Sequence, residues 1–182
     1  SILKNYGVPS RIHNFNLYRR AFIHKSYVKR PHLENEANKI QIVDKPNDCL
    51  PLRTKSNERL EFLGDGILEC ITKYYLYRRF PKENEGVLDK RFAVLVKRST
   101  CSEVAWSLGL QNFIIMGNQK KMISKNDEKI LSDSCEALIG AIYIDKGFDI
   151  SQEFILKIWK KNIDKSDITI LDSKTKLQEY SL

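Results

Sequence analysis

The feature that most constrains the fold is a long stretch of helical periodicity between Asn57 and Pro81, NERLEFLGDGILECITKYYLYRRF. Asn57 is a favoured residue at a helix N-terminus, and Pro81 cannot continue a helix. The core-facing side of this helix would comprise Leu60, Leu63, Ile67, Cys70, Ile71 and Tyr74. The pattern therefore predicts one long central helix that packs against a hydrophobic core.

Helical periodicity also dominates the rest of the chain. It recurs over residues 14–28, 84–110, 132–147 and 151–163, whereas strand-type alternation is almost absent. We therefore expect an all-α helical bundle of about seven to nine helices around a buried central pair. Residues 29–56 contain three prolines and no clear periodicity, so they are expected to form a long surface excursion.

A row of acidic side chains accompanies the predicted central helix. At about 100° per residue, Glu58, Glu61 and Asp65 fall within an arc of about 60°, on the side opposite the apolar face. The row is thus expected to be accessible to solvent while a packed helix holds it in place.

Asp133 and Glu136 form a second acidic pair, three residues apart on a later predicted helix. The buried side of that helix would comprise Leu131, Cys135, Leu138 and Ile142. Like charges at this spacing destabilise a helix by up to about 0.5 kcal/mol, and a bound cation would remove the repulsion. Mg²⁺ prefers carboxylate oxygens and activates water in many nucleases. Spacing alone leaves a solvated acidic face as the alternative.

The charge balance indicates the kind of partner. The chain holds 31 Lys and Arg against 23 Asp and Glu, a formal net charge of +8. This balance suits a polyanion, and a merely basic soluble surface is the alternative. No long apolar run or signal peptide is visible, so we expect no membrane association and an intracellular protein, in the cytoplasm or, if viral, in a host compartment. The widely spaced Cys49, Cys70, Cys101 and Cys135 predict reduced, structural thiols.

Two segments resemble a known family. Residues 57–67, NERLEFLGDGI, resemble the ribonuclease III signature, and residues 132–148, SDSCEALIGAIYIDKGF, resemble the family's second catalytic segment. The resemblance extends over residues 14–162. It implies a ribonuclease III endonuclease domain over residues 1–165, which forms a two-fold homodimer. It also implies hydrolysis of double-stranded RNA with Mg²⁺, or Mn²⁺ as a substitute, giving 5′-phosphate ends and short 3′ overhangs.

The resemblance assigns roles to particular residues. It makes Glu61, Asp65, Asp133 and Glu136 the metal ligands, with Asp65 and Glu136 catalytic and Glu136 the most critical. Glu58 and Glu85 would support the site across the dimer, and ordinary surface charges are the alternative. Phe62 would be buried in a socket of the partner, and an exposed aromatic on a monomer is the alternative.

Other positions are assigned with less support from the pattern. Lys129 is similar in placement to a catalytic lysine of some family members, and a solvated partner of Asp133 is an equal alternative. His24 and Ser26 are expected to pack and to form hydrogen bonds. Gly66 replaces the serine or alanine that is usual after the signature aspartate, which suggests a close backbone approach.

The C-terminal stretch of the chain also resembles part of this family. Residues 166–182 resemble a linker and the first turn of a double-stranded RNA-binding domain.

A non-catalytic binder of duplex RNA is the first alternative function, and the four intact metal carboxylates argue against it. A DNA-directed regulatory protein is the second, and competition between RNA and DNA would distinguish it.

Overall fold

The computed structural model describes residues 2–28, 55–118 and 122–179, with side chains described as far as residue 166. Most of the predicted 29–56 excursion, with Cys49, lies outside the described residues. The elements are α1 (Ile2–Asn5), α2 (Phe15–Ala21), α3 (Lys25–Val28), α5 (Glu58–Arg79), α6 (Glu85–Val96), α7 (Arg98–Ser107), the 3-10 turn η3 (Leu110–Asn112), α8 (Glu128–Lys146) and α9 (Phe148–Glu179). No strand occurs in the described ranges, so the all-α prediction is confirmed.

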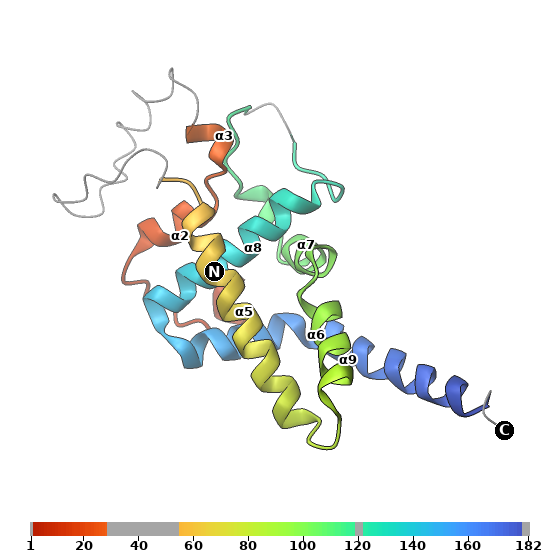
Figure 1. The fold of residues 1–182 in the computed structure, drawn as a ribbon. Coiled ribbons are helices and arrows are strands. Elements are labelled where there is room, and N and C mark those ends of the chain that lie inside the picture. Colours follow the sequence, from red (N-terminus) through yellow and green to blue (C-terminus); the bar gives the residue numbers. More distant parts are fainter. Residues whose placement is uncertain (1, 29–54, 119–121, 180–182) are drawn as a thin grey trace.

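Helix α8 forms the centre of the molecule, and α5 crosses it (Figure 1). Nearly every side chain of α8 from Leu131 to Ile142 is buried, including the four residues predicted to face the core. Helix α5 instead keeps one face exposed, with Phe62, Tyr74 and Tyr77 in solvent. The predicted buried central pair is therefore one buried helix with α5 packed along one side of it.

The buried face of α5 differs from the predicted face. Cys70 and Tyr74 are exposed, whereas the buried positions are Leu60, Gly64, Leu68, Ile71, Thr72 and Leu76. The packed face is rotated because the contact with α8 is centred on Gly64 rather than on a large apolar side chain. A Cβ atom at Gly64 would lie 1.7 Å from the backbone oxygen of Glu136.

Two glycines allow this close crossing of α5 and α8. A Cβ atom at Gly140 would lie 2.4 Å from the backbone oxygen of Leu60, so each helix presents a glycine to the backbone of the other. The close approach predicted at Gly66 is wrong, because a Cβ atom there meets no described atom within 4 Å. The backbone contact belongs to Gly64, two residues earlier.

The predicted helix over residues 14–28 is interrupted. Helix α2 ends at Ala21, and Ile23 forms an isolated parallel bridge with Ile115 before α3 begins at Lys25. The bridge is stabilised by the His24 N–H donating to the Ile115 carbonyl (3.0 Å). Pairing with a distant segment therefore overrides the local helical pattern.

Helix α9 packs behind α8 and then extends away from the other helices (Figure 1). Arg91 of α6, which is 3% exposed, braces α6 against α9. Its guanidinium group donates to both oxygens of Glu83 (2.7 and 2.9 Å) and to the Ser166 carbonyl (3.5 Å), and it lies 3.8 Å from the Phe80 ring centroid. The backbone of α9 continues without a break through the predicted boundary at residue 166.

Among the described residues, none of the helices is both long and apolar enough to cross a bilayer. Cys70, Cys101 and Cys135 carry free thiols, of which the last two are buried.

Candidate active site

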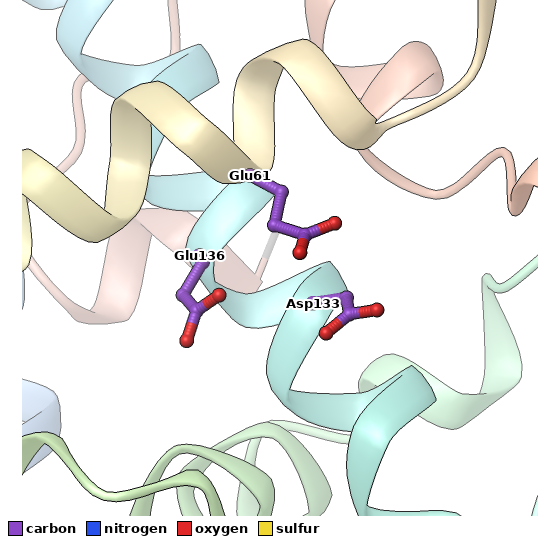
Figure 2. A group of neighbouring side chains, drawn as sticks. All are labelled: Glu61, Asp133 and Glu136. Atoms are coloured by element: carbon purple, nitrogen blue, oxygen red, sulfur yellow. The ribbon is translucent and has the colours of Figure 1, made fainter.

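Three carboxylates meet where α5 crosses α8. Glu61 of α5 points toward Asp133 and Glu136 of α8 (Figure 2), and one oxygen of each lies within 4.8 Å of the others. Asp133 is only 6% exposed, while Glu61 and Glu136 are partly buried. We call these three residues the carboxylate cluster. An all-oxygen set of this kind suits a divalent metal ion.

The position of Glu61 corrects the sequence expectation about the acidic face. Glu61 lies at the edge of the packed face of α5 rather than opposite it, because the buried face includes the neighbouring Leu60 and Gly64. A carboxylate opposite the packed face would point away from α8. The glycine contacts bring the two backbones together, and this brings Glu61 to the two acidic residues of α8.

Burial and mutual repulsion raise the pKa values of Glu61 and Glu136 in the carboxylate cluster. Burial raises the pKa of Glu136 to about 8, and the negative charges of Asp65, Asp133 and Glu61 add to the effect. Burial also raises the pKa of Glu61, with Asp133 contributing. Raised pKa values mean that the carboxylates pay a free-energy penalty for sharing this volume without a cation. A divalent cation would relieve that penalty.

Asp65 lies beside the cluster rather than within it. Its side chain is exposed and is not among the three whose oxygens converge. Its charge nevertheless contributes to the raised pKa of Glu136. Partial loss of contact with solvent raises the pKa of Asp65 itself, and the charge of Glu69 adds to this. The structure thus brings three of the four predicted metal ligands together and leaves the fourth at the side of Glu136.

Lys129 pairs with the cluster. Its Nζ atom donates to both oxygens of Asp133 (3.0 and 3.3 Å), one helical turn away. This hydrogen bond raises the pKa of Lys129, and Glu61 also contributes. The predicted partnership with Asp133 is therefore present, and the same contact holds the ammonium group next to the carboxylate cluster.

The three supporting residues occupy different surroundings. Glu58 accepts hydrogen bonds from Lys25 Nζ and Ser56 Oγ, each at 3.2 Å. Glu85 begins α6 and lines a pocket of about 270 Å³ between α5 and α6, which does not include the cluster. Phe62 is 84% exposed, as expected for this chain by itself.

The comparisons with known proteins decide the family. The model of the family described as Ribonuclease-III-like matches residues 14–162. The chain belongs to the ribonuclease III-like family. It is 48% identical over 127 residues to Ribonuclease 3 of Pelagibacter ubique, covering 70% of this chain and 57% of that protein. With Ribonuclease 3 of Rhodopseudomonas palustris the identity is 43%, over 71% of this chain and 48% of that protein.

Solved structures agree with this ribonuclease III-like assignment. The nuclease domain of ribonuclease III from Campylobacter jejuni superposes with a TM-score of 0.65 at 31% identity, covering 89% of this chain and 96% of that one. Dicer from Pichia stipitis has a TM-score of 0.58 at 22% identity, covering 88% of this chain and 61% of that one, and it shows the fold alone. The chain spans about half to three fifths of the length of the curated relatives it matches.

Two residues next to this ribonuclease III-like site, Cys101 and Lys25, received no site role from the sequence. The Cys101 thiol of α7 donates to the Val96 carbonyl (3.6 Å), and burial together with the charges of Glu136 and Asp65 raises its pKa well above the usual range. The charge of Lys25 lowers the pKa of Glu61. His24 and Ser26 form the expected hydrogen bond (2.8 Å). Cys101 carries no spacing signal because it lies on a third helix. Lys25 lies on the short helix α3, so no spacing within α5 or α8 links it to the acidic residues.

Proposed function

We propose that this chain is the catalytic domain of an endoribonuclease that hydrolyses phosphodiester bonds of double-stranded RNA. The observation that carries the proposal is the meeting of Glu61, Asp133 and Glu136 within 4.8 Å on two crossing helices. The names of the curated relatives and of the C. jejuni nuclease domain support the same activity. The net charge of +8 supports binding to the RNA backbone, which is recognised mainly through phosphates and duplex shape.

The proposed metal is Mg²⁺, with Mn²⁺ as a substitute, held by the carboxylate cluster together with Asp65. A bound divalent ion supplies an activated water and neutralises charge on the scissile phosphate. Asp65 and Glu136 are the proposed catalytic carboxylates. Lys129 remains paired with Asp133 and presents positive charge to the substrate phosphate. The products would carry 5′-phosphates and short 3′ overhangs.

The proposed active form is a homodimer. Phe62 supports this, because an aromatic side chain 84% exposed on the helix that carries Glu61 suits burial against a second copy. The solved C. jejuni nuclease domain has a region involved in dimer formation. Glu58 and Glu85 would support the site across that interface.

Residues 1–165 would form the catalytic domain, and 166–182 would begin a linker to an RNA-binding domain. Because the curated relatives come from bacteria, we place the enzyme in the cytoplasm.

The direct test is incubation of the protein with long duplex RNA and Mg²⁺. Wild-type protein should cleave it, and Glu136→Gln should retain RNA binding while cleavage falls below detection. Glu153→Gln is the matched control, because Glu153 is an exposed glutamate of α9 paired with Lys157 (2.7 Å). Intact RNA under conditions in which a known ribonuclease III cuts would contradict the proposal, as would normal cleavage by Glu136→Gln.

A further inference from the structure

Residues 22–26, which lead into α3, are held in place near the carboxylate cluster by hydrogen bonds. The Ile115 N–H donates to the Phe22 carbonyl (2.8 Å), and the His24 N–H donates to the Ile115 carbonyl (3.0 Å). The Gly117 N–H donates to Ser26 Oγ (3.1 Å), and a Cβ atom at Gly117 would lie 2.3 Å from the Ser26 carbonyl oxygen. These contacts fix the backbone that carries His24 and Lys25.

The hydrogen bonds also determine the tautomer of His24. Because Ser26 Oγ accepts from Gly117, its hydroxyl hydrogen is available for His24 Nδ1, 2.8 Å away. The Ser26 N–H also points at Nδ1 (3.2 Å). Nδ1 is therefore the acceptor, and the neutral ring carries its hydrogen on Nε2. Burial lowers the pKa of His24, which keeps the ring neutral near pH 7.

Both residues lie at the edge of the acidic site. The charges of Asp133 and Glu58 act on His24. Lys25 Nζ donates to Glu58 Oε1 (3.2 Å), and its charge lowers the pKa of Glu61. One hydrogen bond to Glu58 leaves the Lys25 ammonium group with further N–H donors, since lysine has three. An N–H donor and a cation therefore stand together beside the carboxylates.

A histidine N–H and a lysine ammonium group that stand together offer two hydrogen-bond donors and a positive charge, which suit an anion. We propose that His24 and Lys25 form a phosphate-binding arm that holds a backbone phosphate of the RNA next to the scissile one. The arm rests on the proposed function, because it requires an RNA strand at the carboxylate cluster. His24 donates through Nε2–H, and Lys25 supplies charge and hydrogen bonds.

Two variants isolate the arm. His24→Asn places Oδ1 where Nδ1 accepts from Ser26, so it keeps the anchor and removes only the Nε2–H donor. Lys25→Gln removes the charge from a partly exposed side chain. His13→Asn is the matched control, because His13 lies beside Asp145, which is about 18 Å along α8 from Asp133 at 1.5 Å per residue.

The readout is the affinity for duplex RNA in a Glu136→Gln background, where cleavage does not interfere. Each arm variant should weaken binding about tenfold, the effect expected for losing one hydrogen bond to a charged group. The Tm should not change in either arm variant, and His13→Asn should bind RNA as tightly as the Glu136→Gln background does. Unchanged RNA affinity in both arm variants would overturn the proposal, and so would an equal loss in His13→Asn.

Three further outcomes remain decisive. If His24→Asn lowers the Tm, Lys25→Gln decides alone, because the Lys25 ammonium group bonds to the exposed Glu58 rather than to a buried group. If wild-type protein leaves duplex RNA uncut while it binds RNA through the arm, the proposed function fails and the arm stands. If wild-type protein cuts RNA and the arm variants bind it normally, the arm fails and the function stands.

Discussion

At the residue scale, two glycines of α5 have opposite surroundings and make a matched test of the crossing. Gly64 faces the Glu136 backbone, while a side chain at Gly66 would meet open space. We expect Gly64→Ala to lower the free energy of unfolding by about 1–3 kcal/mol through overpacking and to reduce RNA cleavage more than tenfold. Gly66→Ala should raise the free energy of unfolding by about 0.5–1 kcal/mol. Urea denaturation and a cleavage assay measure both effects.

Gly66→Ala is the control in this pair, because the sequence suggested a close backbone approach at Gly66 and the structure shows none there. Equal stability of Gly64→Ala and wild-type protein would show that α5 and α8 do not approach as closely as described. A loss of stability in Gly66→Ala would show that its side of α5 is covered.

Glu136 makes the stability of the metal-free protein depend on pH. Its pKa is about 8, above the ordinary value of 4.5. The folded state therefore binds this proton more tightly than the unfolded state does. The resulting stabilisation is fully present below about pH 4.5 and is lost as the pH rises through about 8. We expect the Tm in EDTA to fall over this range, and to fall less in Glu136→Gln. Calorimetry at several pH values measures the difference, and identical slopes would contradict the account.

At the scale of elements, local patterns predicted where helices lie better than which face each one buries. Pro81 and the periodicity after Asn57 locate α5, because caps and apolar spacing are local properties. The buried face depends on Gly64 meeting α8, which no local pattern contains. The interruption of the 14–28 helix was missed for the same reason, since the bond from Gly117 to Ser26 joins residues 91 positions apart.

The brace between α6 and α9 gives a test at this scale. Arg91→Ala would leave the largely buried Glu83 carboxylate without its bidentate partner. We expect the free energy of unfolding to fall by about 3–5 kcal/mol, as for breaking other buried ion pairs. Lys90→Ala, at the neighbouring exposed position, should change it by no more than about 0.5 kcal/mol. Similar values for the two variants in urea denaturation would show that the brace contributes little.

At the scale of the whole molecule, the candidate site was predictable from the sequence only in part. The family-like segments identified Glu61, Asp133 and Glu136, whose oxygens converge in the structure. Asp65 is four residues after Glu61 on α5, yet it is exposed and its oxygens are not among those that converge. Cys101 lies on a third helix, α7, and no spacing within α5 or α8 predicts that it packs near Glu136.

The exposed side chain of Phe62 on α5 predicts that two copies of the chain associate. Phe62→Asp should convert the proposed homodimer to a monomer, because it would place a charge in an apolar socket. Phe15→Asp, at another exposed phenylalanine on α2, should leave the assembly unchanged. Sedimentation velocity measures the mass in solution. A wild-type monomer, or a dimer that survives Phe62→Asp, would contradict the proposed interface.

The central claim is that the carboxylate cluster holds a divalent ion. The most direct measurement is the anomalous density of a crystal soaked in Mn²⁺. The account predicts a peak between α5 and α8 that oxygens of Glu61, Asp133 and Glu136 coordinate together, and that disappears in Glu136→Gln. A soaked crystal with Mn²⁺ bound elsewhere and no peak between these three carboxylates would contradict it.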